Sequence, residues 1–248
     1  MGALLSLREV SVSFQRGRRH VVSVLANASL DVDRGELVAV LAQRAQGKTT
    51  LLRVAAGMER PACGTARFKG DDLYGLSDRR RSALLRRQIA FAEPFGPDVD
   101  LPVLAYVAFP LLADLSTKEA YIRARIALER VGALECAEQS WMSLADSERA
   151  LAAVAQAIVR RPELLLVDDL TATLGLGATE RKGRLLRSIA DEDGLAVLMC
   201  VSDADATTWF DRVASLSGGE LVVAPAEGDD PGENVIDFPS DPSRRASL

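Results

Sequence analysis

Residues 42–50 decide the fold of this chain, and they read Ala42-Gln43-Arg44-Ala45-Gln46-Gly47-Lys48-Thr49-Thr50. Their second half matches the end of the phosphate-binding pattern G-x-x-x-x-G-K-[ST], in which backbone N–H groups and a lysine hold the phosphates of a nucleotide. The first glycine of the pattern would fall at position 42, where this chain has alanine. The half that remains predicts that Lys48 contacts the β- and γ-phosphates and that the Thr49 hydroxyl coordinates Mg²⁺.

The segments on either side of this loop support a nucleotide-binding role. A short apolar run at 36–41 predicts a strand before the loop, and residues 50–56 predict a helix that ends at Gly57. A strand, a loop and a helix in this order aim backbone N–H groups and the helix dipole at an anion. The alternative is a chance Gly-Lys-Thr-Thr at a helix start, and the two correct flanks disfavour it.

Length and composition indicate a globular chain. The 248 residues are enough for one large core or for a domain with a subdomain. Its first residues lack the layout of a signal peptide, and no apolar run approaches the roughly 20 residues that span a bilayer. The 3 scattered cysteines suggest neither a disulfide framework nor a zinc site, and the single histidine argues against histidine chemistry. We therefore expect a cytoplasmic protein.

Charge is distributed unevenly along the chain. The net charge is −5, and residues 227–248 carry 6 acidic and 2 basic side chains, so they account for −4 and leave −1 for the remainder. Residues 225–248 are rich in Pro, Asp, Gly and Ser, which predicts a disordered acidic tail. The arginines at 79–81 and 86–87 lack an aromatic platform, so we expect the solvated face of a helix and no nucleic-acid partner.

Periodicity along the rest of the chain predicts an α/β fold, because strands alternate with helices. The predicted strands lie at 5–14, 21–32, 65–69, 89–92, 164–167 and 196–201, the first two as an antiparallel pair. The predicted helices lie at 77–87, 118–131 and 148–159. Several prolines between 94 and 112 predict a region without regular structure.

An acidic pair, Asp168-Asp169, follows the apolar run at 164–167. Such a run suits a strand buried on both faces of a parallel sheet, and ligands of these folds bind at the carboxyl ends of the strands. We predict that Asp168 holds the metal, directly or through water, and that Asp169 polarises an attacking water. The alternative is that the two acids cap the next turn, and the phosphate-binding loop earlier in the chain favours the metal.

Over residues 3–223 the chain resembles the ATP-binding cassette (ABC) transporter ATPases. The landmarks that carry the resemblance stand in the order of that family: 34–36, 55–57, 61–65, the Walker B-like segment 161–171, 211–213 and 219–221. Residues 69–112 are most similar to the branch that serves lipoprotein-release and macrolide-efflux permeases. The resemblance implies a P-loop NTPase (RecA-like) α/β core with an N-terminal antiparallel β subdomain. It also implies a helical subdomain inserted at about 94–160, inside an ATP-binding domain of residues 1–224.

The resemblance also implies the ligands and partners. ATP and Mg²⁺ would bind between two subunits arranged head to tail, as a homodimer or heterodimer with a second ATP-binding subunit. The pair would be held by a permease subunit, peripheral to the inner face of the membrane. The nucleotide-binding residues implied are Phe14, which would stack on adenine, with Ala42, Gln43, Arg44, Ala45, Gln46, Gly47, Lys48, Thr49 and Thr50. The implied metal ligands are Thr49 and Asp168, and the signature-like segment is Leu144, Ala145, Asp146, Ser147 and Glu148.

Most catalytic positions depart from the family pattern. The substitutions are Asp169 for the catalytic Glu, Ser202 for the switch His, Gly175 for the D-loop Asp, and Glu93 or Pro94 for the glutamine that senses metal and permease. Ala42 and Ala45 replace loop glycines; an alanine held at positive φ costs on the order of 1 kcal/mol, whereas ordinary dihedrals make the change nearly harmless. Ala145 removes a hydroxyl, and Asp146 places a negative charge where the partner's triphosphate should lie.

These departures leave three functions open. We expect an ATP-binding subunit of a transport complex with weak or absent hydrolysis. The alternatives are a slow but active transport ATPase and a regulatory scaffold that binds no nucleotide; an unrelated P-loop kinase is disfavoured by the signature-like segment.

The resemblance implies a permease contact within residues 93–115. The aromatic candidates for that contact are Phe95, Tyr106 and Phe109. The alternative for these rings is packing inside the helical subdomain.

Overall fold

Two sheets organise the residues that the computed structural model describes, which are 2–16, 20–93, 96, 100–168, 176–202 and 209–223. The larger sheet has the strand order β10-β9-β3-β8-β7-β6, and the smaller one has the order β2-β1-β4-β5. The predicted tail, 225–248, lies outside the described residues.

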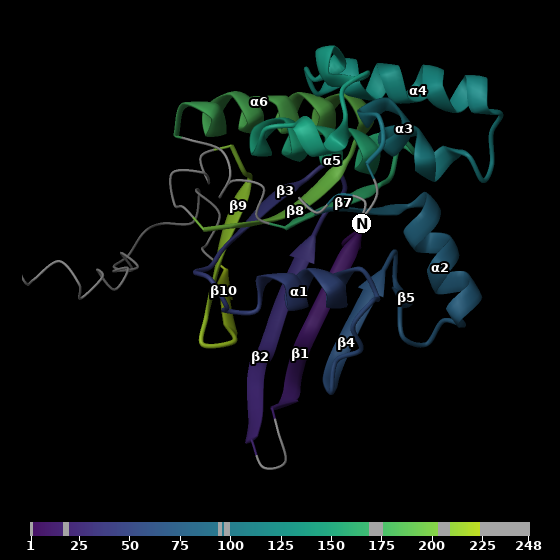
Figure 1. Cartoon of the computed structure of the whole chain (residues 1–248). Coiled ribbons are helices and arrows are strands. Elements are labelled where there is room, and N and C mark those ends of the chain that lie inside the picture. Colours follow the sequence, from purple (N-terminus) through teal and green to yellow (C-terminus); the bar gives the residue numbers. More distant parts are fainter. Residues whose placement is uncertain are drawn as a thin grey trace, which may run out of the picture.

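The larger sheet forms the centre of the molecule (Figure 1). Its strands are β3 (Leu37–Leu41), β6 (Ile89–Ala92), β7 (Leu164–Asp168), β8 (Ala196–Val201), β9 (Arg212–Ser217) and β10 (Glu220–Val223). All neighbouring pairs are parallel except β9 and β10. Along β7, Leu164 and Leu166 enter one hydrophobic cluster and Leu165 and Val167 enter the other. The prediction of a strand buried on both faces is therefore confirmed.

The smaller sheet packs against one face of the larger one. It consists of β1 (Leu5–Arg16), β2 (His20–Val32), β4 (Cys63–Phe68) and the short β5 (Asp71–Asp72), all antiparallel. The alternating apolar residues of β1 and β2 turn inward into the same cluster as α1 (Lys48–Ala55). The predicted antiparallel pair is confirmed, and α1 begins two residues before the predicted helix.

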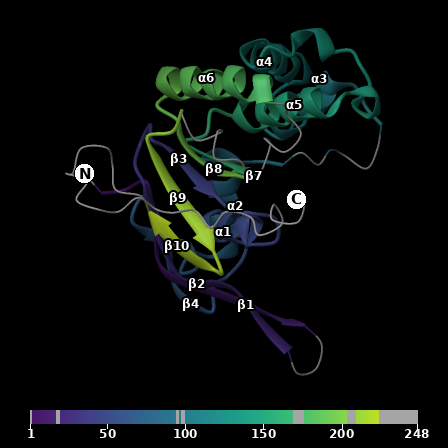
Figure 2. The same cartoon turned by 90° about the vertical axis from the view of Figure 1, so that its left-hand side faces the viewer.

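The remaining helices cover the other face of the central sheet (Figures 1 and 2). They are α3 (Val103–Ala108), α4 (Thr117–Arg130), α5 (Asp146–Ile158) and α6 (Leu176–Asp193), with 3₁₀ turns η1 (Phe109–Leu111), η2 (Leu134–Cys136) and η3 (Trp141–Ser143). Helix α2 (Asp78–Arg87) lies at the edge, beside β6. No helix among the described residues is long and apolar enough to cross a membrane.

The prediction that residues 94–112 lack regular structure is wrong. Helix α3 occupies the middle of this stretch, with Pro102 at its N-cap. Pro110 then sits in the first turn of η1. Proline is tolerated at both places because an N–H at a helix start has no intrahelical acceptor. The prolines therefore bound the helix instead of breaking it.

Candidate functional site

The loop at 42–47 joins β3 to α1 and is closed by backbone contacts. The Ala42 N–H donates to the Val201 carbonyl over 2.9 Å, which ties the loop to β8. Gly47 is the N-cap of α1 at φ 97°. A Cβ at this position would lie 2.9 Å from both Cγ1 and the carbonyl oxygen of Val24 in β2. Only glycine fits there, because side chains rarely adopt this φ and no space remains for one.

The two alanines that replace loop glycines differ in conformation. Ala45 has φ 62°, in the left-handed region, whereas Ala42 is not among the residues with positive φ. Ala42 is also buried, with 3% of its surface exposed. The conformational cost expected of an alanine for glycine exchange therefore falls on Ala45 alone.

Lys48, the first residue of α1, is the buried charged residue of this site. It is 8% exposed, and its Nζ donates to the Oγ of Ser202, just after β8. A buried ammonium favours an anionic partner because its hydration has been removed. The structure thus brings the predicted switch position, Ser202, into contact with the lysine that is predicted to bind phosphate.

The two predicted metal ligands also meet, although they are far apart in sequence. The Thr49 hydroxyl donates to Oδ2 of Asp168 at the end of β7, over 2.6 Å. Hydroxyl and carboxylate oxygens are ligands that Mg²⁺ prefers, and Mg²⁺ commonly takes its remaining ligands from phosphates and water. Among the described residues no group of three or more His, Cys, Asp or Glu side chains is placed to hold a metal. Two oxygen ligands suit an ion that takes its remaining ligands from phosphates and water, so the pair fits Mg²⁺ bound together with a nucleotide.

The strand order explains why these residues gather at one edge. Strands β3, β8, β7 and β6 are consecutive neighbours in the sheet. The loop follows β3, Ser202 follows β8 and Glu93 follows β6, while Asp168 is the last residue of β7, so all four lie at the same edge. Ligands of open α/β sheets bind at this edge. Of the remaining predicted positions, Pro94, Phe95, Asp169 and Gly175 lie outside the described residues.

Phe14, the predicted adenine-stacking residue, lies on the β1–β2 hairpin. Its ring is 42% exposed, and it pairs with Val22, two residues before the Val24 that contacts the loop at Gly47. Sequence reasoning gave no signal for Val24, since a close backbone approach depends on how the hairpin crosses α1. The hairpin thus presents an open aromatic ring beside the phosphate-binding loop.

The signature-like segment forms the start of α5, on the opposite face of the central sheet from α1. The Ala145 N–H donates to Oε2 of Glu148 over 2.7 Å. The other carboxylate oxygen of Glu148 accepts from Sγ of Cys136, 3.5 Å away. Burial, and then this hydrogen bond, raise the pKa of the Cys136 thiol to about 11. Ala145 has no side-chain oxygen, so the reciprocal bond of a capping box is missing.

Asp146 has a partner that sequence reasoning missed. Its carboxylate is 68% exposed and lies 3.4 Å from the guanidinium of Arg149, which also donates to the Met142 carbonyl over 3.1 Å. The spacing of three residues on one helix is the signal that would have identified this pair. An exposed pair of this kind is weak, so it offsets the charge of Asp146 only in part.

A groove of about 550 Å³ lies between α2 and β6 on one side and η1 and α5 on the other. Phe109 lines it and is 72% exposed, as expected for a contact residue. Tyr106 does not fit the prediction of an exposed aromatic. It is 9% exposed, and its ring lies 4.3 Å from that of Trp141, centroid to centroid. Tyr106 therefore packs the helical lobe.

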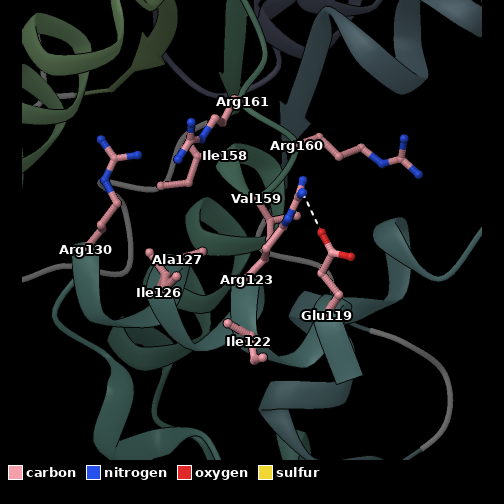
Figure 3. A pocket seen from close by; sticks show the side chains of 10 residues that line it. All are labelled: Glu119, Ile122, Arg123, Ile126, Ala127, Arg130, Ile158, Val159, Arg160 and Arg161. Carbon is pink, nitrogen blue, oxygen red and sulfur yellow. Dashed lines mark hydrogen bonds and ion pairs between the residues drawn. The ribbon is translucent and has the colours of Figure 1, made fainter. Parts of the chain in front are cut away.

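A second groove, of about 420 Å³, lies between α4 and the end of α5 (Figure 3). Ile122 and Ile126 each expose half of their surface there. Its arginines are largely paired: Arg123 with Glu119, for example, over 2.7 Å. The groove contains no residue of the phosphate-binding loop or of the signature-like segment.

Comparison with known proteins identifies the family of the chain. The profile of the ABC transporter family matches residues 25–172, so the chain belongs to that family. It is an ATP-binding subunit of the ABC transporter class. The chain is 31% identical, over 90% of its length, to the lipoprotein-releasing system ATP-binding protein LolD 1 of Rhodospirillum rubrum, 99% of which is covered. It is 32% identical to LolD of Cereibacter sphaeroides over 90% of this chain and 100% of that protein.

Solved structures show the same fold. A dimeric bacterial ABC transporter cassette superposes with a TM-score of 0.81 at 23% identity, covering 88% of this chain and 96% of its own. A dimeric cassette in a post-hydrolysis state with ADP and Pi gives a TM-score of 0.80 at the same identity and coverage. The predicted α/β core with an antiparallel β subdomain and a helical subdomain is therefore confirmed.

Proposed function

We propose that this subunit binds Mg-ATP at residues 42–50 and hydrolyses it weakly or not at all, within a membrane transport complex. One contrast carries the proposal. On the binding side, Lys48 is buried and Thr49 meets Asp168 within 2.6 Å. On the side that serves the partner's nucleotide, Ala145 and Asp146 stand at the start of α5. Phe14, Lys48, Thr49 and Asp168 match the family pattern on the binding side, whereas Ala145 and Asp146 depart from it in the second half-site.

The positions of the side chains at this site suggest how Mg-ATP is held. Lys48 exchanges its hydrogen bond to Ser202 for the β- and γ-phosphates, and the N–H groups at the start of α1 complete the phosphate cradle. Thr49 and Asp168 hold Mg²⁺, which neutralises phosphate charge when it is bound. Phe14 offers its exposed ring to adenine.

Two substitutions argue for slow hydrolysis. Asp169 is one methylene shorter than Glu, a retreat of roughly 1.5 Å, and a displacement of about 1 Å can lower a rate around 10²-fold. Ser202 lacks the imidazole that orients the γ-phosphate in the family, and its hydroxyl already contacts Lys48. Each change weakens the chemical step while leaving the ground-state contacts with ATP in place.

The second candidate is a slow but active transport ATPase. Two observations favour it over a scaffold without nucleotide. Ala42 keeps an ordinary φ, so one of the two glycine replacements costs no strain. Asp146 is also partly offset by Arg149.

Titration followed by turnover on the same sample separates these functions. ATP is titrated calorimetrically with and without Mg²⁺, and phosphate release is then measured, with Lys48→Ala as the control for contaminating ATPases. Micromolar binding without turnover above the Lys48→Ala level supports the proposal. Turnover that Lys48→Ala abolishes supports the active enzyme, and no binding at millimolar ATP leaves the scaffold.

The changed half-site has a test of its own. Asp146→Asn removes a negative charge that would face the partner's triphosphate, so it should strengthen ATP-dependent dimerisation about fivefold, equal to roughly 1 kcal/mol at partial screening. Gel filtration with light scattering in Mg-ATP measures this. The matched control is Asp191→Asn, which removes the charge of an aspartate that is exposed on α6 and paired with Arg187. This control should leave dimerisation unchanged. Equal effects of the two variants would contradict a role for Asp146 in the half-site.

We further propose that the groove containing Phe109 receives a permease segment, which makes the subunit peripheral to the inner face of the membrane. The 72% exposure of Phe109 supports this contact. The naming of the relatives as lipoprotein-releasing system proteins supports a permease of that branch. A photoreactive side chain at position 109 should crosslink to an integral membrane protein in native membranes, whereas one at position 122, in the second groove, should not.

We also propose that the chain is divided into an ATP-binding domain at residues 1–224 and an acidic tail at residues 225–248.

A further inference from the structure

Helix α2 carries a dense group of arginines on its exposed side. Five of its 10 residues are arginine, and it has one acidic residue. Asp78 pairs with Arg81 over 2.5 Å within the helix. The other four, Arg79, Arg80, Arg86 and Arg87, are exposed, and no ion pair to them is found within the described part of the chain. We call these four residues the α2 arginine face.

Their spacing gathers the four charges on one side of the helix. Arg79 and Arg86 are seven residues apart, as are Arg80 and Arg87. At about 100° per residue, seven residues fall roughly 20° short of two full turns. Each pair therefore forms a stripe along the helix, and the two stripes are one residue apart. The four guanidinium groups occupy about a third of the helix circumference.

This arrangement contributes little to the stability of the fold. No residue of α2 is buried, and the helix rests on the body through partly buried Leu84 and Leu85. The four arginines are one, six, seven or eight residues apart, so no two of them are helical neighbours at i,i+3 or i,i+4 and they add no pairwise support to the helix. A group of this kind is better explained by a partner of opposite charge than by packing.

The location of the face indicates which partner it meets. Arg86 and Arg87 line the groove that contains Phe109, so the α2 arginine face borders the surface assigned above to the permease. This step rests on the proposed function. If a permease segment occupies this groove, the neighbouring α2 arginine face lies on the side of the subunit that approaches the membrane surface, whose cytoplasmic leaflet is rich in anionic headgroups.

We propose that the α2 arginine face binds anionic lipid headgroups at the membrane surface. A protein partner would need an apolar anchor, because binding energy at protein interfaces concentrates in buried aromatic and aliphatic side chains. Among the described residues, none of the large exposed hydrophobic side chains belongs to α2, and the exposed Phe109 beside Arg86 and Arg87 is assigned above to the permease. Long arginines on a flat helical face suit a layer of mobile phosphates, and clusters of four or more basic residues on a helix bind acidic lipids.

The charge of the whole chain makes the test informative. With a net charge of −5, the protein is repelled by an anionic surface at long range. Binding to such a surface must therefore come from a local positive patch within about a Debye length, roughly 10 Å at 0.1 M salt.

The experiment uses the full chain and vesicles of phosphatidylcholine with and without phosphatidylglycerol, in a flotation assay without nucleotide or permease. We expect binding only to the vesicles that contain phosphatidylglycerol, and its loss at about 1 M salt. The variant Arg79→Gln/Arg80→Gln, whose positions lie outside the groove, should bind at least tenfold more weakly, since each arginine near the surface contributes about fivefold.

The matched control removes the same charge elsewhere. Arg123→Gln/Arg125→Gln on α4 takes away two exposed arginines that are paired with Glu119 and Glu138, and it should leave vesicle binding unchanged. No binding to phosphatidylglycerol, or an equal loss in both variants, overturns the proposal. When vesicle binding is absent, a crosslink from position 80 to a protein in native membranes would show that the face binds a protein instead. ATP titration of the same variants, which does not involve α2, tests the proposed function separately.

Discussion

Ala45 and Ala42 should respond in opposite directions when each is changed to glycine. Ala45 holds φ 62°, where an L-residue loses roughly 1–2 kcal/mol relative to its preferred conformations. Glycine removes that cost but gives the unfolded chain more freedom, which takes back about 0.4–1 kcal/mol. Ala45→Gly should therefore raise the free energy of unfolding by about 0.7 kcal/mol.

For Ala42 both contributions have the same sign. The residue has ordinary dihedrals and is 3% exposed, so glycine relieves no strain there. The substitution deletes a buried methyl group, at about 0.8 kcal/mol, and adds the same unfolded-state entropy. Ala42→Gly should lower the free energy of unfolding by about 1.5 kcal/mol, which places the two variants about 2 kcal/mol apart.

Urea unfolding followed by far-UV circular dichroism measures both values, provided that the slopes with urea agree. In thermal melts a change of 1 kcal/mol corresponds to roughly 2–4 °C for a domain of this size, so the two variants should bracket the parent chain. Equal destabilisation by both substitutions would refute the reasoning, because it would mean that the loop does not hold Ala45 in the left-handed region. ATP titration adds a second readout, since Ala45→Gly alone should tighten binding through a closer backbone approach to phosphate.

Three further substitutions test other parts of the structure. Gly47→Ala should cost about 2 kcal/mol and abolish ATP binding, because its Cβ would lie 2.9 Å from the Val24 carbonyl oxygen; urea unfolding and calorimetry check this. Ala145→Ser supplies the hydroxyl that completes the capping box with Glu148 and should stabilise the chain by about 1 kcal/mol, so an unchanged urea midpoint would argue against the capping geometry. Burial, and to a lesser degree the charge of Glu93, raise the pKa of Tyr106 from its ordinary 10 to about 12. Its neutral form thus stabilises the fold below pH 10, and that contribution is lost as pH rises to 12. The decline in unfolding free energy over this range should be shallower in Tyr106→Phe, and identical slopes would exclude the residue as its source.

The sequence identified those parts of the fold in which local pattern and burial coincide. The apolar run at 164–167 predicts β7 because both faces of that strand are buried, which leaves only apolar residues in it. The sequence also predicts Thr49 and Asp168 as ligands of one Mg²⁺, and in the structure the two side chains meet. Helix α3 was missed because the prolines that bound it look the same in sequence as prolines that break a helix.

What the sequence could not supply were features set by the approach of distant segments. The difference between Ala42 and Ala45 is a difference in backbone dihedrals, which are fixed by the hydrogen bond of Ala42 to β8 and by the turn into α1. The burial of Tyr106 likewise depends on Trp141, a residue of a separate 3₁₀ turn. Two aromatic residues three positions apart, Tyr106 and Phe109, thus have opposite environments that periodicity alone does not distinguish.

The distribution of strain in the loop bears on which of its glycine positions can hold an alanine. Glycine stands at position 47, where a Cβ would strike the Val24 backbone, whereas alanine stands at position 45, where the side chain is exposed. The tolerated change at Ala45 costs about 1 kcal/mol, while the change at Gly47 would displace β2 itself. At the sheet edge Lys48 contacts Ser202 and Thr49 contacts Asp168, and at the start of α5 Asp146 is paired with Arg149. The approach of the Val24 backbone thus decides which of the two loop positions can hold an alanine.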